Sequence, residues 1–271
     1  MGGVNQYRGG RAPRKAFTLI EQLVVISIVV LLLAILLPAL HRARAQARAV
    51  ACQSNLRQAG IYFALYTEQN DYRFFPDLPI GLGYPAWYEP MKAYFIDGPE
   101  VLLCPSANRY RRSSEVHPDW GGGSRSAWEY SGVLASYGTN HWIGSVTEEH
   151  RPGQAADQSW ETPLIRKAAT VPVLLECMFG GGSPTRHDGP PIEDDWHAAC
   201  GRGCNTSHFC LNRHSETINS LFMDWSVRKV GLKELWTLKW HKRYDTAGSW
   251  TKAGGVERED WPRWMRKFKD Y

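Results

Sequence analysis

Hydrophobic residues gather in one long stretch near the start of the chain. Residues 23–37 are apolar at every position except Ser27, and Glu21 and Gln22 lie directly before them. At about 1.5 Å per residue, a helix over residues 17–40 is long enough to cross a hydrocarbon core of roughly 30 Å. The pattern therefore predicts a transmembrane helix with a charged residue, Glu21, near one end. A charge at this depth is unfavourable unless it has a partner.

The helical pattern continues beyond the apolar stretch. Residues 41–49, His-Arg-Ala-Arg-Ala-Gln-Ala-Arg-Ala, are rich in strong helix formers. An amphipathic face with three- and four-residue spacing follows, made of Leu56, Ala59, Phe63 and Tyr66. These features predict one helix over residues 17–69. Its first half, residues 17–40, lies in the membrane, and its second half, residues 41–70, is amphipathic and lies outside it.

Short apolar runs separated by proline and glycine follow the predicted helix. Residues 171–179 indicate a buried strand, and residues 218–223 and 227–230 indicate two strands joined by a tight turn. Residues 101–104 are predicted as a further short strand. The expected fold class is α+β, with the long N-terminal helix packed on a small antiparallel β-sheet domain over residues 71–271.

Composition and charge agree with one membrane helix plus one ordinary globular domain. The chain has 271 residues, 43% hydrophobic and 22% charged, with a net charge of +5. Residues 1–16 hold four basic and no acidic residues, so the remainder has 28 basic against 27 acidic residues, a net charge of +1. This placement predicts a cytoplasmic N-terminus by the positive-inside rule and indicates no nucleic-acid partner.

Three interpretations fit the N-terminal stretch. A cleaved secretory signal peptide usually has an apolar core of about 7–15 residues, which is shorter than the run here. A plain signal anchor fits the length but gives no reason for a carboxylate at Glu21. Residues 15–21, Lys-Ala-Phe-Thr-Leu-Ile-Glu, resemble the processing site of type IV pilins and type II secretion pseudopilins, in which a short basic leader precedes FTLIE.

The resemblance implies a role for each matching residue. Residues 1–16 would be a leader that a prepilin peptidase removes between Ala16 and Phe17, and Phe17 would become an N-methylated first residue. Ala16 stands where the family usually has glycine. Glu21, without a fixed partner in a single subunit, would pair with the N-terminal amine of a neighbouring subunit. Pro38 stands where many pilins carry proline and would kink the helix.

The same resemblance implies a pilin-like fold and a function. The chain would be a pseudopilin subunit that assembles through its N-terminal helix into a type II secretion or type IV pilus-like filament. Its partners would be the prepilin peptidase, other pseudopilin subunits and the inner (cytoplasmic) membrane. It would cross that membrane once, with its N-terminus cytoplasmic and its C-terminal domain periplasmic. No enzymatic activity, catalytic residue, cofactor or metal is expected.

A narrower resemblance covers three segments farther along the chain. Residues 52–58, beginning at Cys52, residues 104–106 (Cys-Pro-Ser), and His214 followed after nine residues by Asp224 are similar to a pseudopilin-like family named for a C-terminal H-x9-D-G signature. Trp225 stands where that signature has glycine, which leaves the turn type open, because tryptophan rarely adopts positive φ. We expect His214 and Asp224 to form a structural polar pair.

The cysteines suggest disulfide bonds more than a metal site. In an extracytoplasmic domain, thiols tend to become disulfides, and six cysteines allow fifteen complete pairings. The candidates are Cys52, Cys104, Cys177, Cys200, Cys204 and Cys210. Cysteines and histidines crowd residues 200–214, but their spacing fits a zinc site only loosely. The acidic run at residues 193–195 lacks the alternating spacing of a calcium loop.

Two other classes of protein stay open. The chain can be a membrane-anchored extracytoplasmic enzyme or glycan-binding module that uses a pilin-like anchor, and its aromatic-rich domain is compatible with this. It can also be a metal-binding module on the same anchor. A new, methylated N-terminus at Phe17 distinguishes the pseudopilin from the anchored enzyme or glycan-binding module.

Overall fold

The computed structural model of the chain describes residues 18–76, 87–95, 98–107, 109–110, 123–130, 132–144, 156–192 and 205–271. The predicted cleavage site at Ala16 and Phe17 lies outside the described residues, as do Cys200, Cys204 and the acidic residues 193–195. The chain divides into two compact units, Met1–Arg44 and Ala45–Tyr271. The second unit therefore includes part of the long helix.

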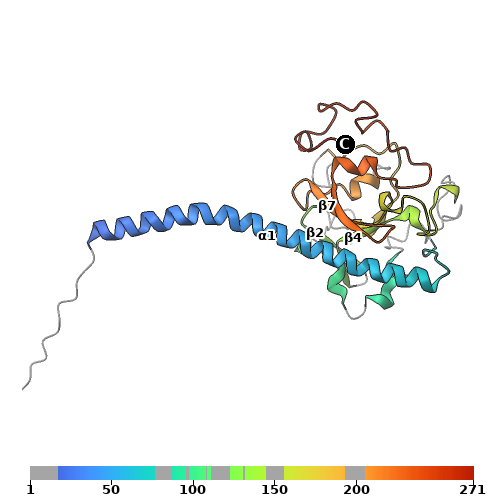
Figure 1. The fold of residues 1–271 in the computed structure, drawn as a ribbon, viewed down its shortest axis with the longest axis horizontal. Helices are drawn as coiled ribbons and strands as arrows, with labels where there is room; N and C mark the ends of the chain where they lie inside the picture. Colours follow the sequence, from blue (N-terminus) through green and yellow to red (C-terminus); the bar gives the residue numbers. More distant parts are fainter. Residues whose placement is uncertain are drawn as a thin grey trace, which may run out of the picture. The chain divides into compact units, whose positions relative to one another are not determined.

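Helix α1 spans Leu19–Gln69, 51 residues, and confirms the helix predicted over residues 17–69 (Figure 1). It continues through Pro38, and the predicted kink there stays a prediction. Its large apolar side chains between Leu19 and Leu40 are all exposed. By length and composition, this one helix among the described residues is suited to cross a membrane.

The second half of α1 buries one face against the sheet of its own unit. The buried positions recur every three or four residues: Ala49, Cys52, Leu56, Ala59, Gly60, Phe63 and Thr67. Gly60 allows α1 to approach the strand that holds Leu221 closely. A Cβ atom there would lie 2.8 Å from Cδ1 of Leu221, so the absent side chain lets helix and strand meet.

A five-stranded sheet in this unit has the strand order β6-β4-β5-β7-β8. Two of its strands, β4 and β7, are labelled in Figure 1. Its neighbouring strands are antiparallel except for β4 and β6, which are parallel. The α+β class is therefore confirmed, although the sheet is mixed rather than purely antiparallel. The strands are β4 (Tyr137–Asn140), β5 (Pro172–Glu176), β6 (Gly181–Gly182), β7 (Thr217–Phe222) and β8 (Val227–Gly231). Strands β5, β7 and β8 confirm the three strands predicted over residues 171–179, 218–223 and 227–230.

A smaller sheet and several short helices complete the described fold. The smaller sheet has the order β1-β2-β3, with β1 (Arg109–Tyr110), β2 (Ser126–Tyr130) and β3 (Val133–Ala135). The helices are α2 (Tyr88–Met91), η1 (Lys92–Tyr94), η2 (Pro99–Leu102), η3 (His141–Ile143), η4 (Ala156–Gln158), η5 (Ala168–Thr170), η7 (Asn205–His208) and η8 (Lys233–Thr237). The strand predicted at residues 101–104 is wrong, because Pro99 begins a 3₁₀ helix there.

Apolar side chains cover both faces of the five-stranded sheet. One core joins the buried face of α1 to Val173 and Leu174 of β5 and to Leu221 of β7. The other core joins Ile218 and Phe222 of β7 to tryptophans of the C-terminal segment. All five residues of β5 are buried, and the four apolar ones are those expected of a strand between two layers.

His241 lies in an aromatic part of the second core. Its ring centroid is 4.7 Å from that of Trp142 and 5.4 Å from that of Tyr244. Burial lowers the pKa of His241 to about 4, and the positive charge of Lys239 acts in the same direction. His241 and Trp142 also line a cavity. Three further charged or titratable side chains line it with them, Arg186, His187 and Arg243.

This environment predicts a pH-dependent loss of stability. The unfolded chain protonates this imidazole near pH 6.5 and the folded chain only near pH 4, so the unfolded state binds more protons between these values. The free energy of unfolding should therefore fall as the pH drops through this window. His241→Asn should reduce the slope of the unfolding free energy against pH. In the wild type, Nδ1 of His241 accepts from the backbone N–H of Arg243 at 3.2 Å. The amide oxygen of asparagine can accept the same hydrogen bond but does not titrate. Urea unfolding across the window measures both slopes, and equal slopes contradict the prediction.

Candidate functional site

The start of α1 gives Glu21 a partner within its own chain. Oε2 of Glu21 accepts hydrogen bonds from the backbone N–H of Thr18 (2.8 Å) and from its hydroxyl (2.9 Å). The N–H of Glu21 donates to Oγ1 of Thr18 at 3.2 Å. This reciprocal pattern is a capping box, which satisfies N–H groups that have no partner inside the helix. The expectation that Glu21 has no fixed partner in a single subunit is therefore wrong.

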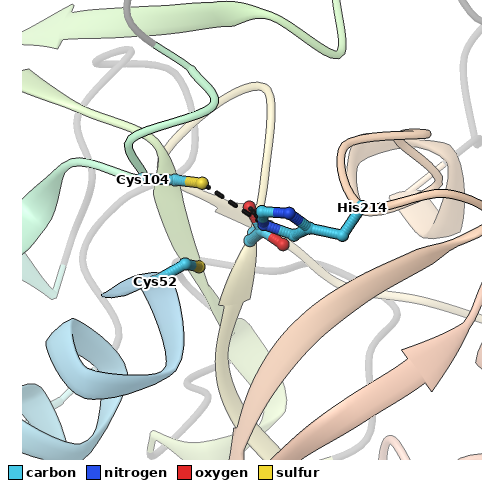
Figure 2. Close-up of side chains that lie close together, drawn as sticks. Cys52, Cys104 and His214 are labelled. Atoms are coloured by element: carbon cyan, nitrogen blue, oxygen red, sulfur yellow. Dashed lines mark hydrogen bonds and ion pairs between the residues drawn. The ribbon is translucent and has the colours of Figure 1, made fainter. Parts of the chain in front are cut away.

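A second constellation lies buried in the globular unit. Cys52, Cys104, Glu176 and His214 each direct one potential ligand atom inward, and these four atoms lie within 4.8 Å of one another. Nε2 of His214 is 3.4 Å from Sγ of Cys104 and 3.1 Å from Oε1 of Glu176. Figure 2 shows the two sulfur atoms and the imidazole ring facing one another from three separate segments.

Each element places its side chain in the cluster for a local reason. Cys52 belongs to the buried stripe of α1, and Cys104 follows the end of η2. Glu176 is the last residue of the buried strand β5. His214 precedes β7, and its N–H donates to the carbonyl of Thr217 at 3.1 Å. The two residues between them, 215 and 216, form a turn in which both have positive φ.

Donors outside the cluster hold three of its four members. The Tyr137 hydroxyl donates to Sγ of Cys52 at 3.2 Å, and the Ser106 N–H donates to Sγ of Cys104 at 3.4 Å. The N–H of Asn219 donates to Oε2 of Glu176 at 2.8 Å, which leaves Oε1 of the carboxylate directed at His214. Such outer donors fix the orientation of an acceptor and favour its deprotonated form.

Arg213 supplies a permanent positive charge beside this cluster. Its side chain is fully buried, and Nη1 lies 3.8 Å from Oε1 of Glu176. Its guanidinium also donates to four backbone carbonyls, those of Ser124 (2.9 Å), Ser126 (2.9 Å), Ser136 (2.7 Å) and Cys177 (3.2 Å). Arg213 therefore joins the start of β2, the residue between β3 and β4, and the end of β5 around one side chain.

The charges of the cluster determine its protonation. Burial alone would raise the pKa of the Glu176 carboxyl, but the hydrogen bond with His214 and the charge of Arg213 outweigh burial and lower it. Burial likewise opposes a charge on His214, yet its contacts with Cys104 and Glu176 raise the pKa of the imidazole to about 9. Without any ligand, the cluster therefore holds a carboxylate beside an imidazolium.

The two thiols of the cluster differ in acidity. A hydrogen bond with Cys52 lowers the pKa of Cys104 to about 7, and His214 and Arg213 act in the same direction against burial. Burial raises the pKa of Cys52. Cys104 is therefore the thiol that ionises first.

The cluster resembles a cysteine–histidine–carboxylate triad only in composition. In such a triad the two ring nitrogens of histidine serve different partners, one the nucleophile and the other the carboxylate. Here Nε2 of His214 is the atom that faces both Cys104 and Glu176. Cys104 and Glu176 are also 0% exposed, so the thiol has no access to a substrate. The arrangement does not support nucleophilic catalysis.

The cluster joins residues that lie far apart in the chain. Cys52, Cys104 and His214 come from the three segments singled out by the narrower resemblance. Glu176 was missed, although a carboxylate inside the apolar run of residues 171–179 is a signal in itself, because a buried charge needs a partner.

The predicted crowding of ligands over residues 200–214 is not one site among the described residues. Nδ1 of His208 lies 2.9 Å from the carbonyl oxygen of Gly181, whereas Sγ of Cys210 lies 4.0 Å from the sulfur of Met265. His214 belongs instead to the buried cluster. Among the described cysteines, Cys52, Cys104 and Cys177 form no disulfide bond, and the disulfide prediction stays a prediction.

The predicted pair of His214 and Asp224 is wrong. The two residues lie beyond opposite ends of β7, and a strand of six residues separates its ends by about 17 Å. Oδ1 of Asp224 instead accepts from the N–H (3.0 Å) and hydroxyl (2.6 Å) of Ser226 in the β7–β8 turn. Trp225 adopts a φ of 64° in this turn, and its ring packs against Phe74 at 6.3 Å. The turn thus keeps the conformation suited to glycine.

Comparisons of the chain with protein-family models, with curated proteins and with solved structures give no significant match.

Proposed function

We propose that the chain is a pseudopilin: a membrane subunit that a prepilin peptidase shortens and methylates at Phe17. It then assembles through α1 with other pseudopilin subunits into a type II secretion or type IV pilus-like filament. In this proposal the helix crosses the inner membrane once, with its N-terminus in the cytoplasm and the globular unit in the periplasm. The chain is a substrate of an enzyme and not an enzyme itself.

The observation that carries the proposal is that α1 combines a membrane-compatible segment with a core segment of the globular unit. One continuous helix holds an exposed apolar segment long enough for a membrane and, from Ala49 on, a buried face that belongs to the core of the globular unit. A cleavable signal peptide has no reason to continue into a core helix of the mature domain. A subunit that polymerises through its N-terminus needs this continuity, because one helix then connects the polymerising segment to the domain.

The N-terminus of the protein after exposure to a prepilin peptidase distinguishes this proposal from a plain signal anchor. Coexpression with a prepilin peptidase should shorten the chain by the sixteen residues that precede Phe17 and add one methyl group to the new amine. Mass spectrometry of the purified N-terminal peptide measures both changes. Ala16→Gly should be cut at least as well, whereas Ala16→Arg should block cleavage and serves as the matched control. A native protein that still begins at Met1, or that begins beyond the apolar segment, contradicts the proposal.

One observation favours the alternative of a glycan-binding module on the same anchor. An open groove of about 700 Å³ is lined by Gly189, Pro190, Ile192, Trp250 and residues 259–264 and 266. Sugar rings commonly stack on such aromatic side chains. However, Trp261 is 2% exposed, and Nε1 of Trp264 donates to the carbonyl of Pro191 at 3.0 Å. These tryptophans therefore stabilise the C-terminal segment, and the pseudopilin proposal is preferred.

A further inference from the structure

The buried cluster has the donor set and the spacing of a metal centre. It offers two sulfur atoms, one imidazole nitrogen and one carboxylate oxygen, from Cys52, Cys104, His214 and Glu176. Calcium and magnesium prefer oxygen ligands, whereas thiolates combined with imidazole select zinc and similar transition metals. Four protein ligands without an open position are typical of a structural site and not of a catalytic one.

The distances agree with tetrahedral zinc. Bonds of about 2.3 Å to sulfur and 2.0–2.2 Å to nitrogen and oxygen place neighbouring donors about 3.6 Å apart for sulfur and nitrogen, and about 3.4 Å apart for nitrogen and oxygen. The corresponding distances here are 3.4 Å from Cys104 to His214 and 3.1 Å from His214 to Glu176. Movements of a few tenths of an ångström would bring these two donor pairs to the distances of a zinc site, and all four donor atoms lie within 4.8 Å of one another.

The charges balance once a divalent ion is present. Two thiolates and one carboxylate bring three negative charges into a site where Cys52, Cys104 and Glu176 are 0% exposed. A divalent cation supplies two positive charges, and the buried guanidinium of Arg213 supplies the third. Buried charges persist only when they are compensated in this way.

The outer donors fit the same function. The Tyr137 hydroxyl, the Ser106 N–H and the Asn219 N–H reach Cys52, Cys104 and Glu176, respectively, from outside the cluster. Hydrogen bonds of this kind orient ligands toward a metal and stabilise their anionic form.

We propose that Cys52, Cys104, Glu176 and His214 form a structural zinc site that ties helix α1 to the five-stranded sheet. On binding, the two thiols and the imidazolium release their protons, and the ion bonds to both sulfur atoms, Nε2 and Oε1. Because the four ligands come from α1, the segment after η2, β5 and the segment before β7, the ion cross-links the extramembrane half of the helix to the domain. This proposal does not depend on filament assembly.

The metal content of the full-length chain tests this proposal. The protein, purified in detergent under reducing conditions, should contain about one zinc ion per chain by elemental mass spectrometry. Replacement of zinc by Co²⁺ should give the intense sulfur-to-cobalt charge-transfer bands and the ligand-field bands of a tetrahedral dithiolate site. These spectra report the bonds between sulfur and the metal directly. Cysteines that only pack in the core would not give them.

Variants assign the ligands. Cys104→Ser and Cys52→Ser should each lower zinc retention during dialysis against a chelator by at least tenfold. Cys210→Ser is the matched control, because this cysteine is also buried but lies beside Met265, and it should retain zinc. If a ligand variant does not fold, the cobalt spectrum of the unchanged protein decides alone.

Two results would overturn the zinc site. One is a reduced, folded chain that binds neither zinc nor Co²⁺ through sulfur. The other is a Cys52–Cys104 disulfide in protein from native membranes, detected as a cross-linked peptide, because a disulfide leaves no thiolate for the metal.

Discussion

Replacing Arg213 by methionine should lower the free energy of unfolding of the globular unit by about 3–5 kcal/mol, the usual effect of leaving one member of a buried ion pair without its partner. The guanidinium is fully buried beside Glu176 and donates to four backbone carbonyls. Methionine fills a similar volume but offers none of these donors. The carboxylate and the carbonyls would then remain buried with fewer partners.

Thermal unfolding of the full-length chain, followed by tryptophan fluorescence, measures this effect. For a domain of this size, the loss corresponds to a decrease in melting temperature on the order of 10 °C. Arg213→Lys should be intermediate, because an ammonium group keeps the charge but cannot reach four carbonyls with a rigid fork. Arg73→Met is the matched control. Its ion pair with Glu161 is 3.4 Å long, but the Arg73 side chain is 68% exposed, so the change should be below about 1 kcal/mol. Similar melting temperatures for the Arg213→Met and Arg73→Met variants would falsify this account of the core.

Replacing Glu21 by glutamine should abolish filament assembly while leaving the helix intact. Glutamine keeps a side-chain oxygen that can accept from the Thr18 N–H and hydroxyl, so the capping box survives. The negative charge is lost, and with it the proposed attraction to the N-terminal amine of a neighbouring subunit. In a low dielectric this attraction is far stronger than in water, so its loss should prevent the subunits from entering the filament in register.

Two further variants separate the charge from the cap. Thr18→Ala removes the hydroxyl and weakens the cap but keeps the carboxylate, so it should still assemble. Glu21→Ala and Glu21→Leu remove both and should behave like Glu21→Gln, because charge and not volume is the missing element. Cysteines introduced along the exposed part of α1 allow cross-linking of neighbouring subunits in membranes. Normal cross-linking ladders for Glu21→Gln, combined with failure of Thr18→Ala, would show that Glu21 serves the helix start and not assembly.

The helix and the hairpin could be predicted from sequence because their signals are local. An unbroken apolar run followed by a three- and four-residue repeat leaves little choice for residues 19–69, and α1 ends at Gln69, as predicted. The β7–β8 hairpin follows from two β-rich runs around a short turn. The strand predicted over residues 101–104 was wrong because four apolar residues fit a strand and a short helix equally well. Only their surroundings, beginning with Pro99, decide between the two.

The sequence by itself determined the long helix, its membrane-compatible half and the α+β class, since periodicity and apolar length act between near neighbours in the chain. The tertiary structure alone decided the buried cluster. Cys104 and His214 lie 110 residues apart in the chain, and Glu176 lies on a strand that seemed merely apolar. Such contacts depend on the order of strands in the sheet and on the place in the sheet against which α1 packs. No spacing along the chain encodes these two features, because each is fixed by the packing of both hydrophobic cores at once.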